Sequence, residues 1–291
     1  MKKEQVKRTK NVFLKDAVGR FVRHKVAMIS LVILVIEILA IIFLPMFLDL
    51  DPFTSHPGQF NKAPGNGFLL GTDAVGRDIF SRIIYGGRVS LSVGFIAAII
   101  SAIIGVPLGL LAGFYGGVVR GVIMRIVDIF MSFPALIIQM VLVTVLGASE
   151  KSLMIVLGVL GWVGYTRLVY SKVLSVKEEV YVEAARATGA TNFTQMVKYI
   201  LPNAMAPVFV TFSFAVAGNI LAESGLSFLG LGVQLPTPTW GNMIRDAQTL
   251  STLMYRPWMW IPAGVVLVVT VVCINFVGDG LRAALDPKIK I

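Results

Sequence analysis

Charged residues are scarce in this chain of 291 residues. Asp, Glu, Lys and Arg together make up 14% of it, whereas they make up about 25% of an ordinary soluble domain. A chain of this length would correspond to about two soluble domains, but it lacks the polar surface that would cover them. The composition therefore excludes a soluble enzyme, and the high apolar content excludes a disordered or collagen-like chain.

Cysteine and histidine are also nearly absent. Cys273 is the single cysteine, which excludes an intrachain disulfide and makes a thiolate metal site implausible. The two histidines, His24 and His56, indicate no imidazole metal cluster. The chain also lacks a G-x-x-x-x-G-K-[ST] stretch, so it is not expected to cradle ATP phosphates by that loop. We therefore expect no metal site, no bound cofactor and no catalytic residue.

Long apolar runs fill most of the sequence. Hydrophobic residues make up 56% of it, and the mean hydropathy is +0.81. A helix needs about 20 residues to cross about 30 Å of hydrocarbon. Six stretches qualify and predict an all-α, polytopic membrane protein with six transmembrane helices: 26–48, 91–115, 121–146, 153–173, 204–222 and 258–277.

The stretches between the spans define the expected organisation of the chain. We expect a basic N-terminal tail, an extracytoplasmic loop, a transmembrane core that contains a cytoplasmic loop, and a C-terminal tail, at 1–25, 49–88, 89–280 (with 174–203 inside it) and 281–291. A second outer loop, 223–257, is also long. Both outer loops are expected to be ordered because they carry glycine, proline and tryptophan rather than a disordered composition.

The basic residues predict the orientation. The chain has 26 basic and 16 acidic residues, a net charge of +10. Six spans put both termini on one side, and placing them in the cytoplasm also places most of the basic residues there, as the positive-inside rule requires. We interpret the positive charge as a topology signal, since on a membrane protein its location matters more than its sum.

Few charged or polar residues interrupt the spans, and each is a candidate functional group. Asp128 lies one helical turn from Arg125, so a local ion pair is an alternative to a role in a transport pathway. Glu37 is expected to be structural or to face a partner. The other candidates for the pathway or an outer gate are Gln139, Asn219 and Glu223.

Small residues predict close helix packing. Gly105, Gly109, Gly113 and Gly117 recur at every fourth position, which places them on one helix face and permits close contact with another helix. Pro134 interrupts a span and predicts a kink there.

The cytoplasmic loop 174–203 is the most informative segment. Its composition predicts a first short helix, a C-terminal cap at Gly189, and a second short helix that is capped by Thr191 or Asn192 and ends at Leu201-Pro202. The small Ala184 and Ala185, beside the carboxylate of Glu183, would let another protein approach closely. We interpret this loop as a docking site for a cytoplasmic partner.

The same loop resembles the EAA loop of ABC importer permeases. The resemblance rests on Glu183-Ala184-Ala185, on Gly189 and on Leu201-Pro202, although Tyr199 stands where the common form has Ile. In that family the loop is a coupling helix in a cleft of the ATPase subunit. The resemblance therefore implies ATPase-coupling roles for Glu183, Ala184, Ala185, Arg186, Gly189 and Pro202.

Three further segments resemble the dipeptide/oligopeptide/nickel permeases, and among these the "C"-type subunit. They begin at Leu70-Gly71-Thr72-Asp73, at Glu223-Ser224-Gly225 and at Asn275-Phe276-Val277. The resemblance implies the type I ABC importer permease fold in the plasma membrane of a prokaryote. It also implies a homologous permease partner, two ATPases that carry ATP and Mg²⁺, and an extracytoplasmic substrate-binding protein. Candidate contacts with that binding protein are Asp73, Arg77, Asp78 and Trp240.

Several functions remain open at this point. The resemblance implies import of short peptides, with nickel or a metal–chelator complex as the alternative. A self-sufficient channel or secondary transporter would need coupling carboxylates deep in the bundle and no docking loop. A membrane-bound enzyme would need a nucleophile–base or histidine-rich constellation, which the spans lack.

Overall fold

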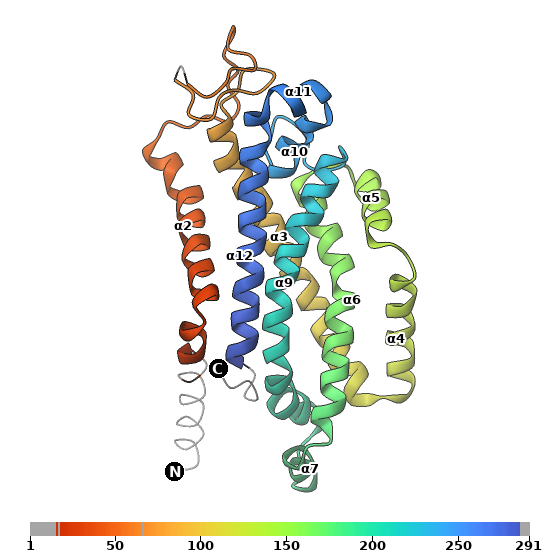
Figure 1. Ribbon diagram of the computed structural model, residues 1–291. Helices are drawn as coiled ribbons and strands as arrows, with labels where there is room; N and C mark the ends of the chain where they lie inside the picture. Colours follow the sequence, from red (N-terminus) through yellow and green to blue (C-terminus); the bar gives the residue numbers. More distant parts are fainter. Residues whose placement is uncertain (1–15, 17, 66, 286–291) are drawn as a thin grey trace.

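The computed structural model describes residue 16 and residues 18–65 and 67–285. These residues form an elongated bundle of helices and no β-strand (Figure 1). The long helices are α2 (Lys25–Phe47), α3 (Ile79–Tyr115), α6 (Glu150–Lys177), α9 (Leu201–Phe228) and α12 (Ile261–Leu285). Most of the expected N-terminal tail and the last residues of the C-terminal tail lie outside the described part of the chain.

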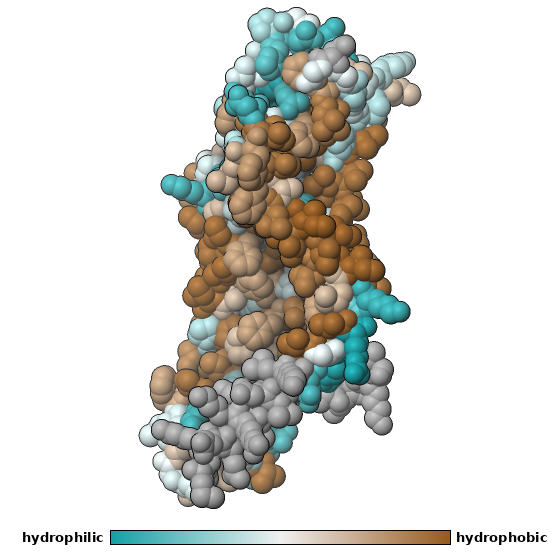
Figure 2. Space-filling view, turned by 90° about the vertical axis from the view of Figure 1, so that its left-hand side faces the viewer, coloured by the Kyte–Doolittle hydropathy of each residue, from teal (hydrophilic) through white to brown (hydrophobic). Residues whose placement is uncertain are grey.

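The long helices match the predicted spans in number. Five helices are long and apolar enough to cross a membrane, and a sixth span is present if the bent pair α4 (Gly117–Met131) and α5 (Ala135–Leu146) counts as one. Figure 2 shows the corresponding band of apolar side chains between hydrophilic ends. Helix α2 begins, and α12 ends, at the same end of the bundle as α7 (Val180–Ala187), as an even number of spans requires (Figure 1).

Glycines bring α3 and α6 into close contact. A Cβ atom on Gly105 would lie 2.4 Å from the carbonyl oxygen of Trp162, and one on Gly109 would lie 2.6 Å from that of Thr166. The Thr166 hydroxyl donates to the Gly105 carbonyl at 3.1 Å. The predicted packing face is therefore confirmed for Gly105, Gly109 and Gly113. Gly117 differs, because it is the first residue of α4, beyond the end of α3, with φ +46° and open space around it.

Helix α2 is attached to the edge of the bundle by polar side chains of α3 and α12. Pro45 has no N–H to offer the carbonyl one turn earlier, and Arg88 of α3 donates from Nε to that Ile41 carbonyl at 3.0 Å. One turn before Ile41 on α2, the Glu37 carboxylate accepts a hydrogen bond from the Thr270 hydroxyl of α12. Glu37 thus has the structural role that was expected for it.

Two span boundaries differ from the prediction. Helix α3 begins at Ile79 rather than near residue 91, because Asp78 caps it and Arg82 in its first turn donates to the Pro52 and Pro236 carbonyls of the outer loops. The predicted third span is two helices, bent by 87° at a break that contains Pro134. Pro134 cannot donate the backbone hydrogen bond that would continue the helix.

The loop after α6 folds as two helical pieces, with one correction. Helix α7 is followed by a turn, and α8 (Asn192–Thr194) continues through a π-helical turn (Gln195–Ile200) directly into α9. The predicted break at Leu201-Pro202 is wrong. Pro202 sits in the first turn of α9, where a missing N–H is tolerated, and the π-helical turn before it absorbs the irregularity.

The outer end is covered by the two long loops. The first is the segment between α2 and α3. The second contains α10 (Trp240–Ile244), a 3₁₀ turn (Arg245–Gln248), α11 (Leu250–Tyr255) and a second 3₁₀ turn (Pro257–Met259). Arg256 joins the loops by donating to Asn61 Oδ1 at 3.0 Å. The described residues of both loops form defined turns and short helices, which agrees with the expectation from their composition.

Candidate functional site: the α7 surface and the outer end

The turn after α7 is held in one conformation by local bonds. Gly189 has φ +82°, a conformation that L side chains rarely adopt. The N–H of Ala190 donates to the Ala185 carbonyl at 3.0 Å, which closes the end of α7. The Thr191 hydroxyl then caps α8 by accepting from the Thr194 N–H. The predicted glycine cap and threonine cap are both confirmed.

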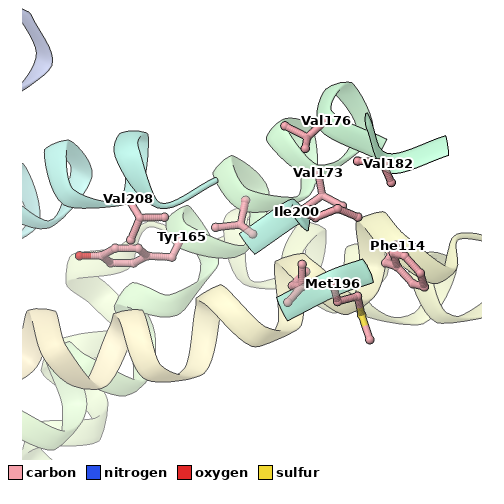
Figure 3. Close-up of a cluster of buried hydrophobic side chains, with 10 residues drawn as sticks. Phe114, Tyr165, Val173, Val176, Val182, Met196, Ile200 and Val208 are labelled. Carbon is pink, nitrogen blue, oxygen red and sulfur yellow. The ribbon is translucent and has the colours of Figure 1, made fainter. Parts of the chain in front are cut away.

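One face of α7 is buried against the bundle. Val182 is fully buried, and Figure 3 shows it in a cluster with side chains from α3, α6 and the π-helical turn. The Phe114 end of α3 is tied to the end of α6, because Lys177 Nζ donates to the Phe114 carbonyl at 2.7 Å. Helix α7 therefore rests on three elements that run into the bundle. The remaining labelled members are Phe114, Tyr165, Val173, Val176, Met196, Ile200 and Val208.

The opposite face of α7 is exposed and carries most of the predicted coupling residues. We call it the α7 surface and define it as Val180, Tyr181, Glu183, Ala184, Arg186, Gly189 and Phe193. Neither Glu183 nor Arg186 forms a side-chain hydrogen bond or ion pair within the described residues. Pro202 is exposed at the start of α9. Ala185 differs from the prediction, since only 6% of it is exposed and it packs inward.

Three apolar members of the α7 surface were missed from the sequence. Val180 is 78% exposed, Phe193 is 70% exposed, and Tyr181 is 41% exposed. Large exposed apolar side chains that cluster at a membrane protein's water-facing end mark a protein interaction site. Their signal was present in the sequence, because a helix of eight residues cannot bury Val180, Tyr181 and Val182 on the same face.

At the outer end, Asp73 organises the first loop. Its carboxylate accepts from the Arg77 N–H at 2.9 Å and from Arg77 Nε at 2.7 Å, and Arg82 Nε lies 3.6 Å away. Asp78 accepts from the Ser81 N–H at 2.8 Å as the cap of α3. We call Asp73, Arg77, Arg82 and the nearby Asp246 the outer cluster. Asp73 and Arg82 are buried, so their charges are satisfied inside the chain.

Asp246 is the member of the outer cluster that forms no ion pair within the part of the chain that the structure describes. Burial, reinforced by the negative charge of Asp73, raises the pKa of its carboxyl to about 6, although Arg82, Arg77 and Arg245 act in the opposite direction. Its charge therefore changes near neutral pH.

Trp240 was expected at a contact with another protein, and the structure places it elsewhere. Its side chain is fully buried, and its indole N–H donates to the Ile83 carbonyl of α3 at 3.1 Å. The ring packs against Gly87, where an added Cβ would lie 2.9 Å from it. Trp240 thus fastens α10 to α3 and offers no surface to a partner.

Glu223 is also buried at the outer end. Its carboxylate accepts from Ser90 at 3.0 Å and from Ser227 at 2.7 Å, and Ser224 is a third, longer donor. The Trp240 N–H donates in turn to the Ser90 hydroxyl at 3.3 Å. We call Glu223 with Ser90, Ser224 and Ser227 the Glu223 network. It joins α3, α9 and α10, so Glu223 does not face an open pathway here.

The other intramembrane candidates lie apart from one another. Asn219 is half-buried and donates to the Gly94 carbonyl of α3 at 3.3 Å. Gln139 is half-buried on α5. Asp128 does not pair with Arg125 as expected, because its carboxylate accepts from Arg167 Nη2 of α6 at 2.8 Å. The contact between α4 and α6 brings Arg167 next to Asp128, although the two residues are far apart in the sequence.

The described residues contain no group of three His, Cys, Asp or Glu side chains that could hold a metal ion.

Comparisons with known proteins match nearly the whole chain. Residues 105–291 match the model of the family "Binding-protein-dependent transport system inner membrane component", and residues 13–64 match "N-terminal TM domain of oligopeptide transport permease C". The chain is 39% identical over 277 residues to the oligopeptide transport system permease protein OppC of Bacillus subtilis (strain 168), covering 95% of this chain and 90% of that one.

Other relatives have similar names. The OppC permease of Salmonella typhimurium (strain LT2) is 42% identical, with 94% of this chain and 90% of that one covered. The dipeptide transport system permease protein DppC of Alkalihalophilus pseudofirmus is 38% identical, with coverage of 95% and 90%. Among solved structures, the MetNI methionine ABC transporter in an inward-facing form has a chain that aligns with a TM-score of 0.60 at 21% identity, covering 72% of this chain and 98% of that one. This likeness supports the ABC importer permease fold.

Proposed function

The chain belongs to the family of binding-protein-dependent transport system inner membrane components, and we propose that it is the permease subunit of an ATP-driven importer of short peptides. It would form the pathway together with a homologous permease. Two ABC ATPase subunits would bind at the α7 end, and an extracytoplasmic binding protein would deliver the peptide at the outer end. The peptide substrate is supported by the relatives, which are named as oligopeptide and dipeptide permeases.

The observation that carries the proposal is the two-sided character of α7. Its outward side exposes Val180, Tyr181 and Glu183, next to the exposed Phe193 of α8, and Glu183 has no side-chain partner among the described residues. Its inward side packs on α3, α6 and the helix that continues into α9. A partner that moves α7 would therefore move the ends of three long helices at once, because close-packed interiors transmit displacement rather than absorb it.

ATP and Mg²⁺ would be held by the partner subunits. The chain has no phosphate-cradling G-x-x-x-x-G-K-[ST] loop, so the free energy for transport has to arrive through a contact. In this mechanism the ATPase subunits would close together when they bind ATP, and α7 would move with them. The bundle then opens outward, and hydrolysis resets it. The buried outer cluster and the Glu223 network support a rigid outer platform, on which the exposed parts of both loops would meet the binding protein.

Nickel or a metal–chelator complex is the weaker candidate substrate. The relatives carry peptide names, and the described residues offer no metal-ligand group. A self-sufficient channel is disfavoured as well. The buried Glu223 carboxylate is bonded to hydroxyls of its own bundle, and a channel has no use for an exposed docking helix.

The function is tested by reconstitution. The chain is co-expressed with its homologous permease and the ATPases, and ATP hydrolysis is measured in liposomes with the cognate binding protein. We expect hydrolysis to be stimulated by binding protein loaded with a short peptide and not by binding protein offered a nickel–chelator complex. A chain that transports peptide as a homodimer without ATPases would contradict the proposal.

A further inference from the structure

An ion pair lies on the exposed side of the bundle between α4 and α6. Asp128 Oδ1 and Arg167 Nη2 are 2.8 Å apart, and the two side chains are 53% and 49% exposed. Both helices belong to candidate membrane spans. The backbone beneath the pair is well fixed, because the neighbouring Val127 is fully buried and Phe130 packs edge-on against Trp162.

The surroundings of the pair are apolar and equally exposed. Ile129 and Met131, on the same helix as Asp128, are each 53% exposed. An exposed apolar surface of this kind suits lipid, but a charged side chain inside the hydrocarbon is strongly disfavoured and normally faces protein or a water-filled cavity. The ion pair therefore indicates that this side of the bundle is not covered by lipid.

Helix α2, on the opposite side of the bundle (Figure 1), provides the contrast. Its exposed residues include Ile29 and Ile36, at 62% and 61%. Its single acidic residue, Glu37, turns away from the exposed side to Thr270. The surface of α2 is thus what a lipid-facing helix requires, and the surface around Asp128 is not.

A dry contact with another subunit does not satisfy the pair either. A guanidinium carries five N–H donors and a carboxylate about four acceptor positions, yet a single hydrogen bond joins the two groups. Burying the remaining donors and acceptors without partners would be costly. Water, or a ligand with charges of its own, satisfies them.

We propose that Asp128 and Arg167 line the water-filled route and form a charge pair that the two ends of a passing peptide can contact. This proposal rests on the peptide permease function proposed above. A peptide with free termini carries an ammonium group and a carboxylate, which are complementary to Asp128 and Arg167 respectively. An exposed ion pair is weak, so it can exchange partners with the peptide and release it again. Arg167 becomes a pathway residue that the sequence did not single out.

The test uses cysteine chemistry in the complete reconstituted complex. The single cysteine is first removed as Cys273→Ala, and this parent is checked for full transport. Asp128→Cys is then treated with two methanethiosulfonates of similar size, one with a sulfonate and one with a trimethylammonium group. Ile29→Cys and Ile36→Cys on α2 are the lipid-facing controls.

We expect Asp128→Cys to react at least about tenfold faster than both controls, because a thiol reacts as the thiolate and ionises in water rather than in lipid. The sulfonate should restore most of the transport lost in Asp128→Cys, since it returns a negative charge beside Arg167, and the trimethylammonium group should not. Equal reactivity with the α2 controls, or equal effects of the two reagents, would overturn the proposal. The reactivity measurement needs no substrate, so it stands even if the transported compound is not a peptide.

The contact with peptide termini is tested separately. Asp128→Asn is compared with the parent for the number of peptides imported per ATP hydrolysed, with a free peptide and with the same peptide acetylated and amidated at its ends. We expect a severalfold loss for the free peptide and little change for the blocked one. The same loss for both peptides would overturn the role in recognising termini.

Discussion

The charged groups at the two ends of the bundle are satisfied in opposite ways. At the outer end, Asp73 and Glu223 are buried and accept several hydrogen bonds each from their own chain. At the other end, Glu183 and Arg186 on the α7 surface are exposed and form no side-chain bonds within the described residues. Buried charged side chains that accept hydrogen bonds from their own chain stabilise the fold. Groups that the chain leaves exposed beside large apolar side chains are available to another protein.

This difference predicts opposite consequences of mutation at the two ends. Changes at the outer end should act mainly on stability. Changes on the α7 surface should act mainly on transport, while the isolated chain stays folded. Substitutions at each end can therefore separate stability from transport.

The largest effect is expected for Glu223→Leu. The substitution leaves the hydroxyls of Ser90 and Ser227 buried without an acceptor, and we expect the free energy of unfolding to fall by about 3 kcal/mol. Thermal unfolding in detergent measures it. Glu223→Gln keeps an acceptor and should lose clearly less. Equal melting temperatures for Glu223→Leu and the parent would contradict the structural role of the Glu223 network.

Glu183→Lys should leave stability unchanged and reduce peptide import about tenfold or more, equivalent to about 1.4 kcal/mol of coupling. The residue is exposed, so the change in unfolding free energy should stay within about 0.5 kcal/mol. Import and ATP hydrolysis are measured in proteoliposomes. Asp49→Lys, an equal change of charge at an exposed outer position, is the control. Similar import by the two variants would show that position 183 has no special role.

Gly189→Val should disturb α7 through the backbone rather than through contacts. No heavy atom lies within 4 Å of the added Cβ, but φ is +82°, and a side chain in that conformation costs about 1–2 kcal/mol. We expect a severalfold loss of import with ATP hydrolysis retained. Gly264→Val is the matched control, since Gly264 also has open space but no positive φ. A larger loss in Gly264→Val than in Gly189→Val would contradict the assignment.

Asp246→Asn tests the outer cluster through pH. The pKa of Asp246 is raised from 3.8 to about 6, so the folded state binds this proton more tightly than the unfolded state does. Its contribution to stability is therefore largest below about pH 4 and is lost as pH rises to about 6. Allowing for solvent screening of a half-buried group, the contribution is about 1–2 kcal/mol.

The difference in melting temperature between Asp246→Asn and the parent should change across pH 4–6 and stay constant above pH 7. Asp49→Asn, at an exposed outer position, is the control. A difference that is independent of pH from 4 to 8 would show that the Asp246 carboxyl does not titrate in this range.

Local signals in the sequence predicted the spans and the turn at Gly189, because hydrophobic length and backbone conformation depend on neighbouring residues. The sequence pattern predicted the start of α3 near residue 91, whereas the helix begins at Ile79. Arg82 and Arg88 look unsuitable for a membrane helix until Asp73 and the Ile41 carbonyl are brought beside them by the fold. The contacts of Trp240 and Asp128 were predicted wrongly for the same reason. Trp240 bonds to Ile83 and Asp128 bonds to Arg167, and both partners are distant in the sequence. Contacts between distant segments decide which polar groups remain exposed.

The reactivity of one thiol shows whether the proposed ATPase subunits bind at the α7 surface. In the Cys273→Ala background, Ala184→Cys places an accessible thiol in the middle of that surface, and Ala74→Cys places one at the outer end. The labelling rate with a charged maleimide is compared for the permease pair alone and with both ATPases bound. We predict that the ATPases slow labelling of Ala184→Cys at least about tenfold and leave Ala74→Cys unchanged, because a residue sealed in an interface is shielded from solvent. Equal rates for Ala184→Cys with and without the ATPases would show that the ATPases do not bind at the α7 surface.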